Sequence, residues 1–304
     1  MTISVDLFAG MGGFTAGAEA AGCSVVWAAN HWPEAVAVHA ANHPRTAHAC
    51  QDLHQMDWAQ VPAHDLLTAS PACQGHAHAR GRERPGHDTA RSTAWAVVSA
   101  LEAGRASVAL VENVPEFRKW ALYPAWREAL RLLGYAVAEH IIDAADHGVP
   151  QHRRRLFLVL SRSQAPLVLR LPRREHVGAG NFLNFEAGTW APVHQPGRAA
   201  ATLARYEMGR RVHGDRFLLP YYGTARGGRS LSKPIGTITT SANHHAVIDG
   251  ARMRMLLASE VCAAMGFPKG YKIPERRTLA CHMLGNAVCP PVATALIQAV
   301  REAA

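Results

Sequence analysis

The chain has 304 residues, of which 48% are hydrophobic and 18% are charged. This length and composition allow about two domains with substantial cores, and they argue against a disordered chain. Lys and Arg number 32 against 23 Asp and Glu, which gives a formal net charge of +9. Such an excess favours a polyanionic partner, although a merely basic soluble protein shows the same balance.

The six cysteines show neither CxxC pairs nor the spacing of a disulfide framework, which is typical of reduced thiols in the cytosol. No run of about 18 apolar residues indicates a membrane span. The opening MTISVDLFAG lacks the basic and apolar regions of a signal peptide. We therefore expect a cytoplasmic protein. Because a strand begins almost at Met1, we also expect no N-terminal regulatory domain.

Strand-like and helix-like segments alternate along the first half of the chain. Apolar β-rich runs occupy residues 2–8, 24–30, 64–70, 107–113, 135–143 and 155–162. Helix-prone segments occupy residues 14–22, 89–104 and 123–134, and another begins at Pro33. Strands and helices that alternate at this spacing predict βαβ units and a mostly parallel sheet.

The pattern changes after about Gln164. Residues 165–250 are richer in Gly, Pro and Arg, and their short β-like runs, 216–223 and 236–242, follow no βαβ rhythm. We interpret this region as a smaller, β-containing second domain. The last segment, 284–304, is predicted to be helical, with Pro290 and Pro291 near its start.

The first strand runs through Asp6 into a Gly-rich turn that ends at Gly13 and precedes a helix. This geometry suits a nucleotide-like cofactor, because glycines let the backbone approach the ligand and the helix offers N–H groups. The spacing is not GxGxxG, so an NAD site is not supported. A tight turn without any ligand is the alternative.

Two further strand ends offer candidate ligand contacts. The second strand ends at Asn30-His31-Trp32, where many nucleotide-binding units place an acid that accepts from the ribose hydroxyls. Trp32 offers a flat apolar face but is equally well explained by core packing. Asp52 follows a short third strand, and a turn or capping role explains it equally well.

Cys73 directly follows the buried strand 64–70. The carboxyl end of a parallel strand is where α/β sheets place their ligands. A lone cysteine is more often an inert small hydrophobic residue. Here the basic loop from His76 to Arg84 follows, and nearby arginines favour the reactive thiolate.

Glu112 also ends an apolar strand, and its carboxylate is therefore expected to be partly desolvated, which suits proton sharing with a bound heterocycle. The alternative is a capping or salt-bridged glutamate. Further along, Gln151, Arg153 and Arg155 alternate in an extended segment and are expected to face the same side. The alternative there is an ordinary basic strand edge.

Together these segments resemble the motifs of the cytosine-5 DNA methyltransferase family, in the family's order and over nearly the whole chain. The matching segments are DLFAGMGG (6–13), PACQ (71–74), ENV (112–114), QHRRR (151–155), MGFP (265–268) with Glu260, and GNAVCPPVA (285–293). The resemblance implies a Rossmann-like, mostly parallel α/β methyltransferase domain formed by residues 1–164 and 282–304. Residues 165–281 would form a target-recognition domain.

The resemblance also implies S-adenosylmethionine as cofactor. Phe8 and Trp32 would contact its adenine, Asp52 would approach the adenine amino group, and Asn286 would line the pocket beside the methionine part. The complete set of implied cofactor residues is Phe8, Ala9, Gly10, Met11, Gly12, Gly13, His31, Trp32, Asp52 and Asn286.

For catalysis, the resemblance implies that Cys73 attacks C6 of a flipped-out cytosine in double-stranded DNA. Glu112 would hold N3 and the exocyclic amine, Arg155 would contact the base near O2, and Arg153 would support the site. Substrate contacts are implied for Gln74, Gly75, Arg80, Arg82, Asn113 and Gln151. We expect no metal and a monomer, encoded by a bacterial restriction system, a phage or an orphan locus.

Three residues depart from the family pattern. Ala72 replaces the usual second Pro before the nucleophile, His31 replaces the usual ribose-binding acid, and Ser259 stands where Arg is frequent. Two other functions stay open. One is an RNA methyltransferase, since one family branch shares these motifs but modifies tRNA. The other is a catalytically silent DNA-binding accessory protein, against which Cys73, Glu112, Arg153 and Arg155 argue together.

Overall fold

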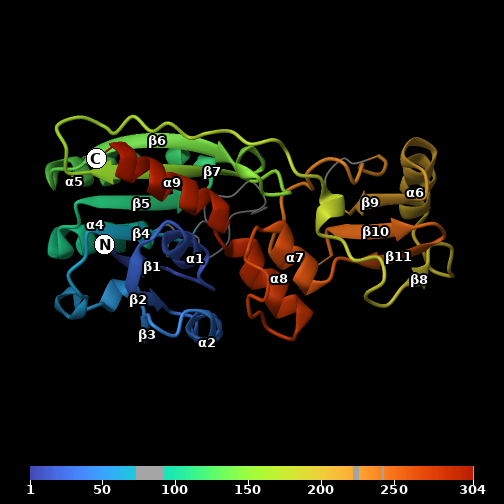
Figure 1. The fold of residues 1–304 in the computed structure, drawn as a ribbon, viewed down its shortest axis with the longest axis horizontal. Coiled ribbons are helices and arrows are strands. Elements are labelled where there is room, and N and C mark those ends of the chain that lie inside the picture. Colours follow the sequence, from blue (N-terminus) through green and yellow to red (C-terminus); the bar gives the residue numbers. More distant parts are fainter. Residues whose placement is uncertain (73–91, 222–225, 242, 304) are drawn as a thin grey trace. The chain divides into compact units, whose positions relative to one another are not determined.

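The computed structural model describes residues 1–72, 92–221, 226–241 and 243–303. The chain forms two compact units (Figure 1). Unit 1 comprises Met1–Asp143, Arg154–Arg173 and Ala287–Ala304, and unit 2 comprises Ala144–Arg153 and Arg174–Asn286. Compactness does not by itself define a functional domain, so the predicted boundaries at residues 165 and 281 stay a prediction.

Unit 1 is built on a seven-stranded sheet in the order β3-β2-β1-β4-β5-β7-β6. The pairs within β3-β2-β1-β4-β5 are parallel, whereas β7 is antiparallel to both β5 and β6. The predicted mostly parallel α/β fold is therefore confirmed. The strands are β1 (Ile3–Leu7), β2 (Ser24–Asn30), β3 (Ala47–Cys50), β4 (Leu66–Ala69), β5 (Val108–Asn113), β6 (Ala136–Asp143) and β7 (Arg154–Ser161).

Helices cover both faces of this sheet (Figure 1). On one face, α4 and α5 bury Leu101 and Trp126 in the same hydrophobic cluster as β1 and β4. On the other face, α1 packs against α9, and the ring of Phe14 meets that of Phe157 on β7 at 6.2 Å. Among the described residues of unit 1, the α-helices are α1 (Gly13–Ala20), α2 (Pro33–Asn42), α4 (Ala94–Gly104), α5 (Tyr123–Leu132) and α9 (Pro290–Ala303), and the 3-10 turns are η1 (Leu53–Gln55), η2 (Trp58–Gln60) and η4 (Pro115–Lys119).

Strand β1 shows how the alternation of side chains divides the sheet. Val5 and Leu7 are fully buried in the cluster beneath α4. Asp6 points to the opposite face, where its carboxylate accepts a hydrogen bond from Thr15 of α1. The carboxylate at the fourth position of β1 therefore serves the α1 side of the sheet.

The strand order reverses direction between β1 and β4. In open α/β sheets, ligands bind beyond the carboxyl ends of the strands at such a switch point. Phe8 follows β1 and Ser70 follows β4, and the Ser70 amide donates to the Leu7 carbonyl at 3.1 Å. The predicted Gly-rich turn and the segment that leads to Cys73 thus start side by side.

Unit 2 contains a four-stranded antiparallel sheet in the order β8-β11-β10-β9. Helix α6 packs on it through Tyr206, which stacks on Phe217 of β9. The strands are β8 (Ala191–Pro192), β9 (Arg216–Pro220), β10 (His245–Asp249) and β11 (Arg252–Met255); the helices are α6 (Ala200–His213), α7 (Ala258–Ala264) and α8 (Arg277–Asn286); the 3-10 turns are η5 (Ala144–His147) and η6 (Ala179–Asn181).

The prediction of a β-like run over 236–242 is wrong: within the described part of this run, residues 236–241, no strand forms. Backbone groups of this segment that would pair with a neighbouring strand form hydrogen bonds with side chains instead. The Ile238 amide donates to Oε1 of Gln151, and the Ile238 carbonyl accepts from Arg153. The hydroxyl of Thr237 donates to the His152 carbonyl.

The predicted helix at the end of the chain is two helices, α8 and α9, separated at Ala287–Cys289. Pro290 and Pro291 begin α9, because proline fits the first turn of a helix but not its interior. Arg277–Ala303 is long and apolar enough to cross a membrane, by length and composition alone, and 72% of its most apolar stretch is buried within the protein.

Candidate active site

The turn after β1 has an unusual backbone. Phe8, Gly10 and Gly12 all adopt positive φ angles, of 55°, 55° and 99°. Glycine accepts this region freely, whereas a phenylalanine there carries strain that the surrounding structure must hold. Gly12 precedes α1 and provides no side-chain cap. The turn leads directly into α1, and the half-buried ring of Phe8 packs against the hydrophobic cluster of unit 1.

Gly13, the first residue of α1, leaves no room for a side chain. A Cβ at this position would lie 2.2 Å from the Val288 carbonyl oxygen, and one at Gly17 would lie 2.4 Å from Cβ of Ala293. The hydroxyl of Thr294 also donates to the Gly17 carbonyl at 3.1 Å. Residues 287–293, in the last of the predicted motifs, thus fix the start of α1 from the far end of the chain.

The ends of β2 and β3 lie next to this turn in the sheet. Oδ1 of Asn30 accepts from the Trp32 amide at 2.9 Å, so it already has a backbone partner. His31 is exposed and Trp32 is half-buried. Oδ1 of Asp52 accepts from the His54 amide at 3.0 Å, which is the capping role that the sequence left open.

Glu112, at the end of β5, forms an ion pair with Arg155 of β7. Nε of Arg155 lies 3.2 Å from Oε1 of Glu112, and the two side chains are only 17% and 9% exposed. The antiparallel pairing of β5 with β7 brings them together, since Glu112 lies opposite Phe157 in the register. The two residues that the family resemblance assigns to the cytosine therefore meet at the carboxyl end of β5.

Asn113 ties the ends of β4 and β5 together. Its Nδ2 donates to the Pro71 carbonyl at 3.1 Å, and its Oδ1 accepts from the Val114 amide at 2.9 Å. Ala72 is held in turn, because its amide donates to Oγ1 of Thr93 at 3.0 Å. The backbone is thus anchored up to the residue before Cys73. Five predicted site residues lie outside the described residues: Cys73, Gln74, Gly75, Arg80 and Arg82.

Gln151 and Arg153 are buried in unit 2 and bind backbone there. Gln151 donates to the Ala264 carbonyl and accepts from the Ile238 amide. Arg153 donates to the carbonyls of Ile238 at 3.0 Å and Gly285 at 2.9 Å. Both side chains engage Ile238, as expected for alternate residues of an extended segment. Asn286, at the end of α8, is exposed.

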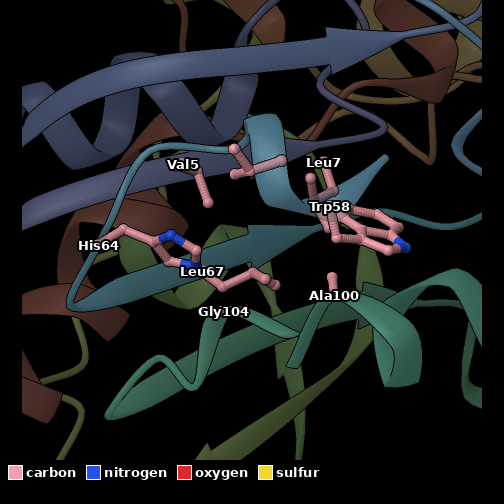
Figure 2. Close-up of a pocket in the computed structure, with 8 residues that line it drawn as sticks. Val5, Leu7, Trp58, His64, Leu67, Ala100 and Gly104 are labelled. Carbon is pink, nitrogen blue, oxygen red and sulfur yellow. The ribbon is translucent and has the colours of Figure 1, made fainter. Parts of the chain in front are cut away.

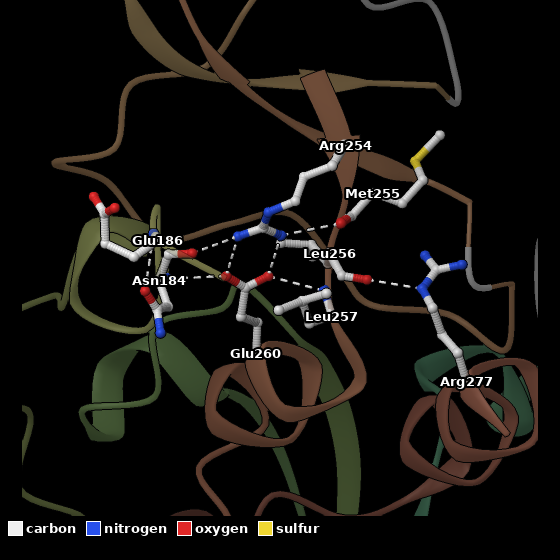
Figure 3. A network of polar contacts seen from close by, with 8 residues as sticks. All are labelled: Asn184, Glu186, Arg254, Met255, Leu256, Leu257, Glu260 and Arg277. Carbon is white, nitrogen blue, oxygen red and sulfur yellow. Dashed lines mark hydrogen bonds and ion pairs between the residues drawn. The ribbon is translucent and has the colours of Figure 1, made fainter. Parts of the chain in front are cut away.

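Glu260 is the centre of a polar network of which the sequence predicted only Glu260 itself. Figure 3 shows Arg254 of β11 facing Glu260 of α7, with two hydrogen bonds of 2.6 and 2.7 Å. Glu260 also accepts from the amides of Leu257 and Asn184. The motif indicated Glu260, whereas Arg254 lies in a short strand that no motif covers. The pair holds β11, α7 and the segment around Asn184 together.

A small cavity in unit 1 lies away from these residues. Figure 2 shows His64 and Trp58 among its apolar lining, with Gly104 of α4 beside them. Its free volume of about 10 Å³ suits roughly one water molecule. The cavity is therefore not a cofactor site. Among the described residues, no group of three His, Cys, Asp or Glu side chains is placed to hold a metal ion.

The family described as C-5 cytosine-specific DNA methylase matches residues 2–186 and 191–302 of the chain. The chain belongs to this family. Its relatives include the Type II methyltransferase M.NlaX of Neisseria lactamica, 28% identical over 98% of this chain and 96% of the relative. The Type II methyltransferase M.MspI of Moraxella sp. is 25% identical over 97% of this chain and 69% of the relative.

Among solved structures, that of the S. pombe Dnmt2 methyltransferase aligns with a TM-score of 0.69 and 18% identity, over 99% of this chain and 98% of the other. At this identity the likeness shows the fold. Membership of the C-5 cytosine-specific DNA methylase family confirms the predicted enzyme class, DNA (cytosine-5-)-methyltransferase, and the predicted Rossmann-like methyltransferase fold.

Proposed function

We propose that this methylase transfers a methyl group from S-adenosylmethionine to C5 of a flipped-out cytosine in double-stranded DNA, through a covalent bond between Cys73 and C6. The observation that carries the proposal is the anchored edge of β4 and β5. Glu112 and Arg155 form an ion pair there, and Asn113 holds the Pro71 backbone two residues before Cys73.

The turn after β1 fits the proposed cofactor. Positive φ angles at Phe8, Gly10 and Gly12 shape a tight turn that leads into the start of α1, whose N–H groups favour such a ligand. The adjacent strand end offers Trp32 as an apolar face for adenine. His31, exposed at this strand end, is the polar side chain that we propose for the ribose; Oδ1 of Asn30 accepts from the Trp32 amide. The roles of Asp52 and Asn286 stay predictions.

In the proposed chemistry, the thiolate of Cys73 adds to C6 and forms the S–C6 bond. Glu112 holds a proton at N3, so that the electron pair displaced from the C5–C6 double bond makes C5 nucleophilic. Arg155 keeps the Glu112 carboxyl in place and contacts the base near O2. S-adenosylmethionine would supply, when bound, the methyl group that C5 takes, and the electron pair of the broken S–CH3 bond would stay on the sulfur of the departing S-adenosylhomocysteine. A base then removes the C5 proton, and the Cys73 thiolate leaves C6 to restore the ring.

The target carbon cannot be reached inside a duplex, so the cytosine must leave the base stack at a cost of about a few kcal/mol. We propose that unit 2 recognises the DNA target and that Arg80 and Arg82 bind phosphates, with an affinity that falls as salt rises. The net charge of +9 supports a polyanionic partner. The relatives named Type II methyltransferases support a bacterial enzyme of a restriction system. That the enzyme is cytoplasmic and acts as a monomer stays a prediction.

The test is expression in a host without cytosine methylation, followed by base-resolution mapping of modified cytosines in DNA and RNA. The expected result is complete 5-methylcytosine at one short DNA sequence, absent with Cys73→Ala. Methylation of RNA alone would establish the RNA methyltransferase instead. Full methylation by Cys73→Ala would overturn the covalent mechanism, and no methylation of either nucleic acid would favour the silent accessory protein.

A further inference from the structure

A row of hydrogen-bonded polar side chains, here called the polar chain, lies next to the Gly-rich turn of unit 1. Thr15 donates from Oγ1 to Oδ2 of Asp6 at 2.8 Å, and Nε2 of His39 lies 3.0 Å from the same Oγ1. On the other side of the ring, Nδ1 of His39 lies 2.8 Å from Nε2 of His48. The chain therefore links β1, α1, α2 and β3 in one line.

The position of this chain relates it to the turn. Asp6 lies two residues before Phe8, and Thr15 lies in the first turn of α1, two residues after Gly13. The Asp6–Thr15 hydrogen bond therefore closes the base of the turn, with Thr68 of β4 donating to the second carboxylate oxygen at 2.9 Å. Asp6 and Thr15 are at most 1% exposed.

The ring of His39 must donate one hydrogen bond and accept another. Burial first, and then the nearby His43 and His48, lower the pKa of His39 to about 3. The ring is therefore neutral at ordinary pH, with one donor and one acceptor nitrogen. Since the only hydroxyl hydrogen of Thr15 goes to Asp6, Nε2 of His39 donates to Thr15 and Nδ1 accepts from His48. A side chain without both functions leaves Thr15 or His48 unmatched.

We propose that His39 is a positioning residue for the methyl-donor turn: through Thr15 it holds the first turn of α1 on Asp6 and so fixes the backbone that receives the donor. This role rests on the proposed function, because it presumes that the turn binds S-adenosylmethionine. It adds to that function a residue on α2, which lies on no motif and makes no contact with the turn itself.

The test compares His39→Leu with His39→Gln. Leucine removes both hydrogen bonds, whereas the glutamine amide supplies a donor and an acceptor about as far apart as the two ring nitrogens. We expect His39→Leu to raise the dissociation constant of S-adenosylhomocysteine and the KM for the donor about 10-fold or more, because a displaced turn binds the donor poorly. We expect kcat at saturating donor to change less than about twofold, and His39→Gln to restore the parent values.

His43→Gln is the matched control. His43 caps the C-terminal end of α2, one turn after His39, is also buried, and pairs with Glu19 at 2.9 Å; its ring packs against that of His39 at 4.8 Å. It should leave donor affinity unchanged. If His39→Leu does not fold, His48→Leu gives the same test from the half-buried end, with the same expected rise in the dissociation constant.

The outcomes separate the two proposals. If the parent protein binds no S-adenosyl compound, the proposed function fails. If the parent binds it, but the folded leucine variants bind equally well, or glutamine does not rescue, only the role of His39 is overturned. Nitrogen NMR of the labelled parent gives an independent reading: His39 must show one protonated and one unprotonated ring nitrogen at pH 7, and a charged ring would contradict the proposed chain.

Discussion

Glu112 and Arg155 lie on the neighbouring antiparallel strands β5 and β7 and form an ion pair of 3.2 Å at the carboxyl end of β5. A nearly buried pair of this kind is weak evidence for stability, because the cost of desolvation offsets the attraction. Its placement next to the anchored segment before Cys73 gives it a different purpose. The guanidinium fixes the direction of a carboxyl group that the proposed reaction needs at one atom of the base.

We expect Glu112→Gln to lower kcat for methyl transfer by about 10²- to 10⁴-fold, the range for loss of a positioned proton donor. The dissociation constant of S-adenosylhomocysteine should not change, since the carboxyl group has no predicted contact with the donor. Single-turnover methylation of a duplex that contains the mapped target measures the first quantity, and calorimetry the second.

A matched control is Glu128→Gln, which removes a carboxylate that pairs with Arg131 on the exposed surface of α5. Exposed pairs contribute little, and this variant should behave as the parent protein does. Activity of Glu112→Gln within tenfold of the parent would remove Glu112 from the proton step.

Asn113→Leu should uncouple the ends of β4 and β5. The change leaves the Pro71 carbonyl and the Val114 amide without their side-chain partner, at a cost of about 1–3 kcal/mol for each buried group. Urea unfolding measures this loss. At a temperature where the variant is folded, kcat should still fall, because the segment that precedes Cys73 is released.

Asn42→Leu serves as the control, since its amide donates to the Val38 carbonyl at the half-buried end of α2. A loss of stability in Asn113→Leu without any loss of kcat would show that the tether serves the fold alone.

Much of unit 1 could be predicted because its signals are local. An apolar run such as β4 followed by turn residues indicates a strand whatever surrounds it. The contacts of Gln151 and Arg153 could not be predicted, because they depend on Ile238, about 85 residues away in the sequence, whose backbone they capture. The same long-range competition removed the expected strand at 236–242. Likewise, the sequence of the four-residue strand β11 does not indicate that Arg254 faces Glu260.

The Arg254–Glu260 pair gives a stability prediction for unit 2. Both side chains are at most 3% exposed, so replacing either one leaves a buried charge. Arg254→Met should destabilise the protein by about 3–5 kcal/mol, whereas the double variant Arg254→Met with Glu260→Leu should recover part of that loss. Denaturant unfolding of both variants measures the coupling. Equal stability of the single and double variants would contradict an uncompensated charge.

Acid should destabilise the protein through His245. Burial first, and then the charges of Arg229 and His244, lower the pKa of His245 from 6.5 to about 3. Between these two values the unfolded chain takes up a proton that the folded protein refuses. Stability is therefore lost as the pH falls from about 6.5 towards 3, by at most about 1.4 kcal/mol per pH unit for this group.

Urea unfolding at intervals from pH 8 to pH 4 measures this slope, and His245→Gln should reduce it. Asp6 acts in the opposite direction, because burial raises its pKa from 3.8 to about 6, so that the folded protein takes the proton first as the pH falls between these values. Above pH 7.5 the imidazole of His245 is neutral in both the folded and the unfolded protein. The stability difference between the parent and His245→Gln should therefore be constant there. An unchanged slope in His245→Gln would exclude His245 as its source.

Gly13→Ala should separate cofactor binding from general packing of α1. The added Cβ would lie 2.2 Å from the Val288 carbonyl oxygen, a backbone atom that cannot rotate away, so the start of α1 must move. Gly17→Ala produces a comparable clash, 2.4 Å from Cβ of Ala293, but one helical turn beyond the donor turn. Both variants should lose about 1–3 kcal/mol of stability, as overpacked sites do. Only Gly13→Ala should also weaken the binding of S-adenosylhomocysteine, measured by calorimetry on the folded protein. Equal affinities of the two variants would place the donor away from the start of α1.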